Sequence, residues 1–192
     1  MFAATCYNSP DKYAERIGKS CLSTGHTSGS RSRFVEMRIS EVSRACIDQL
    51  IRAEQGVVKN VQSQRYVQGD FEYYTDPRIA QDEEINAYYT DCMETIRTLR
   101  EGLSEALSSK HGLSGEKLNE VVRGLNPMAI HSKVTIAFNV EALIHLIHVR
   151  LCTCAQDEIR QLAKLIREEV LKLIPELEEY LVPICDYLMW CP

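Results

Sequence analysis

Two short stretches of the chain alternate between apolar and polar residues, which is the pattern of a β-strand with one buried face. Residues 33–39 and residues 131–138 both show this alternation. The apolar positions are Val35, Met37, Ile39, Val134, Ile136 and Phe138. We therefore predict two strands of a small sheet.

Apolar residues spaced three or four positions apart, which is the helical pattern, dominate the rest of the chain. The pattern predicts helices over residues 9–18, 40–51, 79–110 and 114–126, and a helical C-terminal part over residues 139–183. Ser40 and Ser114 are the expected caps of two of these segments, where their side chains can accept hydrogen bonds from free backbone N–H groups, and Asn139 opens the C-terminal part. Pro175 is expected to interrupt the C-terminal part.

Two polar segments separate these elements. Residues 23–32 (STGHTSGSRS) are rich in Gly, Ser and Thr, which is typical of a loop. Residues 55–68 break the helical pattern and are expected to form an extended polar connection. Because no repeat or linker divides the chain, residues 1–192 are predicted to form a single α+β domain, helix-rich around a small mixed or antiparallel sheet.

The charge and hydropathy of the chain narrow its expected partners. A formal net charge of −5 provides no basic excess for general nucleic-acid binding, so an anionic ligand would need a local cluster of Arg. No apolar run approaches the ~20 residues that cross a bilayer, and the N-terminus lacks the apolar region of a signal peptide. We therefore expect a cytoplasmic protein that binds neither nucleic acid nor membrane.

The eight cysteines are scattered, and the chain does not contain two CxxC pairs at the spacing of a zinc finger. Thiols in a chain without a secretion signal are usually reduced and act as small core residues. A metal or redox role for the pair Cys185 and Cys191 is the alternative interpretation.

Polar and basic residues that suit a nucleotide gather in residues 43–52 and residues 60–66. Ser63 and Arg65 are expected on one face of the extended segment, because alternate residues of such a segment share a face. Arg can hold a phosphate with two hydrogen bonds, while Ser and Gln suit sugar or base edges. Since Arg and Gln on a polar loop are often only solvated, these residues alone leave both a nucleotide site and an ordinary surface open.

The segment SRACxxQLxR, followed by SQRY, resembles the signature of the flavin-dependent thymidylate synthases. Further motifs of that family recur in the same order over roughly residues 18–192. They are His26-Thr27-Ser28, Arg123 with Pro127, the span from Asn139 to Arg150, and Ala155-Gln156-Asp157-Glu158-Ile159. Several motifs in the right order are more specific than any one of them.

This resemblance implies the fold and the activity of that family. The expected reaction is C5 methylation of dUMP to dTMP, with FAD as cofactor and with NADPH and 5,10-methylenetetrahydrofolate as co-substrates. A homotetramer with flavin at the subunit boundaries is expected. The alternatives are methylation or hydroxymethylation of a related uridine nucleotide such as UMP, or a non-catalytic nucleotide-binding homologue.

The resemblance also implies roles for individual residues. The residues expected to bind substrate are Gln49, Ser63, Gln64, Arg65, Arg123 and Arg150, and Ser63 and Arg150 are also the catalytic candidates. The residues expected at the flavin and folate are His26, Ser28, Arg52, Glu54, Asn60, Asn139, His145 and His148. His145 and His148 have a spacing that could bind a metal, but no third ligand stands at a suitable step, so no metal site is predicted.

The chain departs from the family pattern in two places. Arg52-Ala53-Glu54 stands where the family has Arg-His-Arg, and the segment that leads to Ser63 is one residue longer. Arg31-Ser32 stands where the family often has Glu-His. Both departures fall on the flavin and folate side of the expected site, whereas the nucleotide side matches.

Overall fold

The structure is a computed structural model that describes residues 8–67 and 69–189. The described chain falls into two compact units. Residues 8–37, 50–59 and 135–189 form the first unit, and residues 38–49, 60–67 and 69–134 form the second. That residues 1–192 act as one domain stays a prediction.

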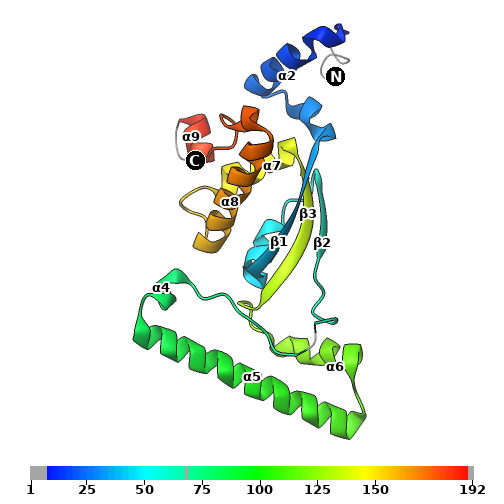
Figure 1. Ribbon diagram of the computed structural model, residues 1–192, viewed down its shortest axis with the longest axis vertical. Helices are drawn as coiled ribbons and strands as arrows, with labels where there is room; N and C mark the ends of the chain where they lie inside the picture. The colour runs from blue at the N-terminus through cyan, green and yellow to red at the C-terminus, as the bar shows by residue number, and fades with distance from the viewer. Residues whose placement is uncertain (1–7, 68, 190–192) are drawn as a thin grey trace. The chain divides into compact units, whose positions relative to one another are not determined.

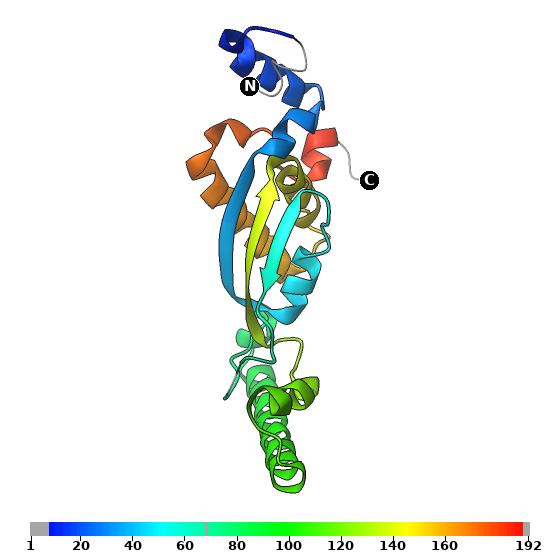
Figure 2. The ribbon, with the colours of Figure 1, turned by 90° about the vertical axis from the view of Figure 1, so that its right-hand side faces the viewer.

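A three-stranded sheet is formed by β1 (Phe34–Ser43), β2 (Val57–Val61) and β3 (His131–Asn139), in the order β1-β3-β2. The sheet is antiparallel, and the arrowheads of β3 and β2 point in opposite directions in Figure 2. In β3, every second residue from Ser132 to Phe138 is buried, as the alternation predicts. Both predicted strands and the α+β class are confirmed, whereas β2 was expected only as an extended connection because its residues do not alternate.

The first unit is built around α7 (Val140–Arg150), which is buried along most of its length. It contacts α8 (Asp157–Leu173), α9 (Ile184–Leu188) and the 3-10 helix η2 (Thr27–Ser32), as Figure 1 shows for α7 and α8. The side-chain oxygen of Asn139, where the helical C-terminal part was expected to begin, accepts a hydrogen bond from Ala142 N at 2.8 Å and caps this helix.

The N-terminal helical segment is longer than the sequence pattern predicts. A 3-10 turn, η1 (Asp11–Tyr13), leads into α2 (Ala14–Ser23), which continues past Gly18. A turn at Gly25, whose φ of 76° suits glycine, follows the end of the helix, and His26 N–H donates to the carbonyl of Cys21 at 2.7 Å. The loop expected over residues 23–32 is therefore wrong in its second half, because η2 follows this helix end. After α8, η4 (Pro175–Leu177) marks the predicted interruption.

The second unit contains α3 (Arg44–Leu50), α4 (Pro77–Ala80), α5 (Glu83–His111), α6 (Gly115–Val122) and η3 (Arg123–Leu125). The start of α3 corrects the sequence prediction: β1 runs through Ser40, and Ser43 Oγ accepts from Cys46 N at 2.9 Å. The helix predicted over residues 79–110 is divided, because Asp82 accepts from Ile85 N and caps α5 separately.

The core of the second unit joins α5 to the segment that precedes α4. Phe71, Met93 and Ile130 are buried together, with Tyr73 and Tyr89 packed against them. The rings of the two tyrosines meet edge to face, with centroids 5.7 Å apart. These tyrosines therefore serve core packing.

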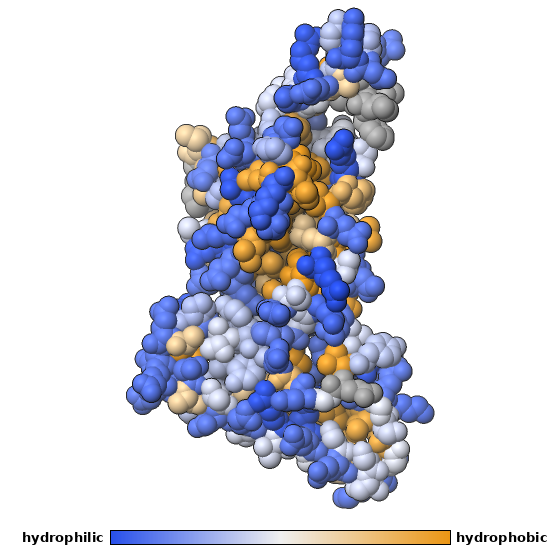
Figure 3. Space-filling model, in the orientation of Figure 1, coloured by the Kyte–Doolittle hydropathy of each residue, from blue (hydrophilic) through white to orange (hydrophobic). Residues whose placement is uncertain are grey.

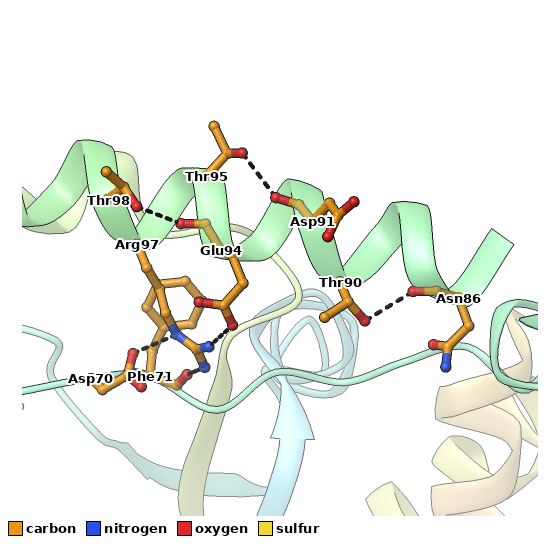
Figure 4. A network of polar contacts seen from close by, with 9 residues as sticks. All are labelled: Asp70, Phe71, Asn86, Thr90, Asp91, Glu94, Thr95, Arg97 and Thr98. Atoms are coloured by element: carbon orange, nitrogen blue, oxygen red, sulfur yellow. Dashed lines mark hydrogen bonds and ion pairs between the residues drawn. The ribbon is translucent and has the colours of Figure 1, made fainter. Parts of the chain in front are cut away.

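Arg97 on α5 fixes the start of that segment, as Figure 4 shows. Its Nε donates to Asp70 Oδ1 at 2.6 Å and its Nη2 donates to the carbonyl of Phe71 at 2.8 Å. A second ion pair joins it to Glu94, and its guanidinium lies 5.2 Å from the centre of the Phe71 ring. These contacts hold Asp70 and Phe71 against α5.

In Figure 3, apolar residues gather over the region of α7 and the strands, whereas the surface over α5 is mostly polar. None of the described helices is long and apolar enough to cross a membrane.

Asp76 makes the stability of α4 depend on pH. It caps this helix, and hydrogen bonds from the side chain and the backbone of Arg78 lower its pKa from 3.8 to about 2. Because the pKa is lower in the folded state, the stabilisation is present above the ordinary pKa and is lost as pH falls towards about 2. We expect Asp76→Ala to lower the free energy of unfolding by about 1 kcal/mol near neutral pH, and by progressively less below about pH 4.

Urea unfolding over that pH range measures the effect. Asp76→Asn is the control, since it keeps a capping oxygen without a titrating charge. A loss for Asp76→Ala that stays constant down to the lowest pH would contradict the assignment.

Candidate functional site

A pocket of about 480 Å³ in the second unit brings together three of the predicted substrate residues. Ser63 and Gln64 reach it from the turn that follows β2, and Arg123 reaches it from the start of η3. Gln64 Nε2 and Asn126 Oδ1 are enclosed here and have no hydrogen-bond partner among residues 8–67 and 69–189. Buried polar atoms are usually hydrogen-bonded, so the pocket suits a polar ligand.

Residues 63–66 form a turn rather than the extended segment that the sequence predicts. Gln62 N donates to the carbonyl of Lys133 at 2.9 Å, which ends the contact with β3. The carbonyl of Ser63 then accepts from Tyr66 N at 3.2 Å, and Ser63 Oγ accepts from Arg65 N at 3.4 Å. Strand alternation therefore does not apply here, so Ser63 lines the pocket and Arg65 turns to α6.

Arg65 is held by two carboxylates that the sequence interpretation did not include. Its Nη2 lies 2.5 Å from Glu116 Oε1 and 3.3 Å from Glu120 Oε2 on α6. Asn119, on the same helix, donates from Nδ2 to the carbonyls of Arg65 and Val67, each at 3.1 Å. The four-residue spacing of the two Glu residues was the available signal, because it places them on one helix face.

The other predicted substrate residues lie on helices of different units. Gln49 is half-buried on α3 in the second unit, near the end of the helix as predicted. Arg150 is the last residue of α7 in the first unit and is also half-buried. The structure thus brings together Ser63, Gln64 and Arg123, and places Arg150 in another unit.

Several residues predicted for the flavin and folate are exposed. Arg52 and Glu54 lie just after α3, Asn60 lies in β2, and His26 and Ser28 lie at η2. His26 also lines a pocket of about 580 Å³ in the first unit. An exposed guanidinium, imidazole and amide fit the anionic and polar parts of FAD, whereas Ala53 offers no polar side-chain atom and Glu54 adds a negative charge.

Asn139 serves the fold directly. It is 5% exposed, its side-chain oxygen caps α7, and its backbone N–H donates to the carbonyl of Gly56 at 2.8 Å. A contact between Asn139 and flavin therefore stays a prediction that leaves only the side-chain NH₂ group for the cofactor.

His148 is also engaged within the fold. Its Nε2 lies 3.0 Å from the carbonyl of Tyr180, and its ring centre lies 5.0 Å from that of Tyr187. Burial lowers the pKa of His148 below 6.5, so the ring is neutral near pH 7. His145 is exposed, and both histidines line a pocket of about 230 Å³.

Glu141, in the first turn of α7, pairs with the segment that replaces the family's Glu-His. Arg31 Nε lies 2.5 Å from Glu141 Oε2, and the hydroxyl of Thr27 donates to the same carboxylate. The hydrogen bonds from Arg31 and Thr27 lower the pKa of Glu141. Arg31 thus links η2 to α7, which the sequence interpretation missed.

The described cysteines include buried Cys46 and exposed Cys154, and those described are free thiols. Cys6 and Cys191 lie outside the described residues, so the alternative role of the Cys185 and Cys191 pair does too. In the part of the chain that the structure describes, no three His, Cys, Asp or Glu side chains are placed to hold a metal ion.

Comparison with known proteins identifies relatives over most of the chain. A protein from Nitratidesulfovibrio vulgaris is 33% identical over 174 residues, which are 90% of this chain and 70% of that protein. A protein from Clostridium tetani is 31% identical over 85% of this chain and 69% of its own length. A protein from Pyrococcus abyssi is 32% identical over 89% of this chain and 70% of its own length. All three are named flavin-dependent thymidylate synthase.

The family Thy1, described as thymidylate synthase complementing protein, matches residues 1–176. This match covers the turn with Ser63, the pocket with Arg123 and the end of α7 with Arg150. It confirms the resemblance that the sequence motifs indicate, and the chain therefore belongs to the Thy1 family of flavin-dependent thymidylate synthases.

Proposed function

We propose that this protein methylates C5 of dUMP to give dTMP, using FAD, NADPH and 5,10-methylenetetrahydrofolate. The observation that carries the proposal is the pocket of the second unit, where Ser63, Gln64 and Arg123 converge beside enclosed polar atoms that lack partners among the described residues. The named activity of relatives that are 31–33% identical supports dUMP as the substrate.

The roles proposed for the residues follow from their chemistry. Arg123 and Arg65 bind the phosphate through charge-assisted hydrogen bonds, and Ser63, Gln64 and Gln49 bind sugar or base edges. Ser63 and Arg150 are proposed to orient the uracil for reaction. When bound, the flavin supplies the transfer and reduction chemistry, so the protein contributes binding, orientation and charge.

We propose that Arg52, Asn60, His26 and Ser28 contact FAD or the folate. Their exposure in the structure supports this role, because a cofactor can reach them. His145 is proposed to contact the same ligands. Glu54, Asn139 and His148 are proposed to contribute less to binding. Glu54 carries a negative charge, while Asn139 and His148 already make hydrogen bonds within the fold.

A homotetramer is proposed as the assembly. Ile85, Tyr88 and Leu99 on α5 are 50%, 73% and 62% exposed, and helical spacing places all three on one side of the helix, away from buried Met93. Apolar side chains exposed along one helix suit an interface between subunits.

Flavin binding tests the proposed function against the non-catalytic alternative. The purified protein is expected to be yellow or to take up added FAD with quenched flavin fluorescence, and NADPH is expected to bleach the bound flavin. A colourless protein that does not quench FAD would contradict the proposal and favour a nucleotide-binding homologue.

Ala53→His is expected to strengthen flavin binding. Ala53 stands at the position where the family motif has His, and alanine supplies neither a donor nor a ring. A recovered hydrogen bond and ring contact should contribute about 1–2 kcal/mol, or roughly five- to thirtyfold in affinity. Fluorescence titration with FAD measures the change.

Two further variants complete this test. Ala80→His, at an exposed position of α4, is the control for adding an imidazole away from the family motif. Glu54→Arg should improve binding only if that side chain points towards the cofactor. Unchanged FAD affinity in Ala53→His would show that this position has lost its family role.

A further inference from the structure

Arg65, one of the two cations proposed to bind the nucleotide phosphate, is already paired within the second unit. Arg65 lies within 3.3 Å of both Glu116 and Glu120, so this small group carries one positive and two negative charges. A phosphate dianion that approached the paired guanidinium would meet an excess of negative charge. Phosphate binding at Arg65 therefore requires the two carboxylates to move away from it.

The same helix fixes the backbone of Arg65. Asn119 stands between the two Glu residues on α6 and holds the carbonyls on either side of Tyr66, those of Arg65 and Val67. The turn is anchored again by the hydrogen bond between Tyr66 N and the carbonyl of Ser63. Because the backbone is held independently of the ion pairs, the guanidinium can leave the carboxylates without the turn coming apart.

The ion pairs are of the kind that a phosphate can displace. The side chains of Arg65, Glu116 and Glu120 are 37%, 44% and 53% exposed, and ion pairs this open to water are weak. Arg–phosphate contacts are commonly bidentate and stronger. A dianionic phosphate can therefore outcompete the carboxylates, at a cost in affinity.

We propose that Glu116 and Glu120 form a carboxylate latch, which holds Arg65 on α6 in the ligand-free protein and which a nucleotide phosphate displaces. The inference rests on the proposed function for the identity of the nucleotide. Glu116 and Glu120 of α6 would act through Arg65 and lower the affinity of the site for the nucleotide.

Calorimetric titration with dUMP tests the latch. The double variant Glu116→Gln with Glu120→Gln is expected to bind dUMP about three- to tenfold more tightly, since each exposed pair opposes binding only weakly. Its matched control is Glu83→Gln with Glu84→Gln, which removes the same charge from two exposed positions in the first turn of α5. The control should change affinity by less than about twofold, because screened distant charges act weakly.

The gain must also depend on Arg65. In an Arg65→Ala background, the Glu116 and Glu120 substitutions are expected to leave dUMP affinity unchanged. Weaker binding, no gain, an equal gain in the α5 control, or a gain that persists without Arg65 would each overturn the latch.

A measurement without nucleotide separates the latch from the proposed function. The side-chain Nη–H signals of Arg65 in an NMR spectrum, assigned by their loss in Arg65→Ala, are expected to shift when Glu116 and Glu120 are replaced, because Nη2 makes both ion pairs. Unshifted signals overturn the latch whatever the ligand. Shifted signals in a protein that binds no dUMP would contradict the proposed function, but they would still support the contact of Arg65 with Glu116 and Glu120.

Discussion

Replacing Arg123 by Ala is expected to weaken dUMP binding by roughly ten- to more than a hundredfold, which corresponds to about 1.5–3 kcal/mol. Arg123 lies exposed at the edge of the pocket that Ser63 and Gln64 line. Losing a charge-assisted contact to a phosphate removes both the attraction and the two-point geometry. On a chain with a net charge of −5, the overall field cannot replace this local cation.

Arg150→Ala is expected to produce a loss of similar size, whereas Arg65→Ala should produce a smaller one. Arg65 must first leave Glu116 and Glu120, so part of its interaction with phosphate only replaces an existing pair. Calorimetry with dUMP measures all three, and Arg78→Ala, at a 75% exposed side chain on α4, is the control. Unchanged affinity in all three variants would remove the basis for the assigned nucleotide site.

The second large effect concerns the close approach of Gly56 to Asn139 in the first unit. Gly56 has φ of 71°, and a Cβ at this position would lie 2.3 Å from the side-chain nitrogen of Asn139. Asn139 is 5% exposed and caps α7, so it cannot move aside without losing that cap. We expect Gly56→Ala to lower the free energy of unfolding by about 2–4 kcal/mol, from backbone strain together with a disturbed cap.

Gly25→Ala provides the matched control in the same unit. Its φ of 76° imposes the same backbone strain, but no atom lies within 4 Å of the added Cβ. It should therefore cost only about 1–2 kcal/mol. Urea unfolding of both variants gives the comparison, and equal losses would show that the approach of Gly56 to Asn139 does not constrain the fold.

The sequence could predict elements whose signals are local. The alternation in β3 and the start of a helical part at Asn139 are both visible in the sequence and are both confirmed, whereas Ser114 precedes α6 without the expected side-chain cap hydrogen bond. Local signals fail where two equivalent residues compete. Ser40 and Ser43 are equally good caps by composition, and strand pairing through Ser43 decides between them. In the same way, α2 passes Gly18 and ends at Ser23, just before Gly25, because, of these two glycines, only Gly25 has a positive φ.

The sequence predicts which residues line the site, but it does not predict which residues they contact. Family motifs select Ser63, Gln64 and Arg123, and the structure places all three at one pocket. No motif indicates that Arg65 turns onto α6, because that direction depends on a turn and on carboxylates more than 50 positions further along the chain. Similarly, the dual engagement of Asn139 as a cap and as the neighbour of Gly56 requires a tertiary contact.

The most direct test of the proposed function is the mass of the nucleotide product. The protein is incubated with FAD, NADPH and 5,10-methylenetetrahydrofolate, and with either dUMP or UMP. We expect conversion of dUMP to dTMP, heavier by one methylene unit, with UMP unchanged and with at least about tenfold less product from Arg123→Ala at a subsaturating dUMP concentration. Unchanged dUMP in a preparation that holds flavin, or a hydroxymethyl product, would contradict the proposed function.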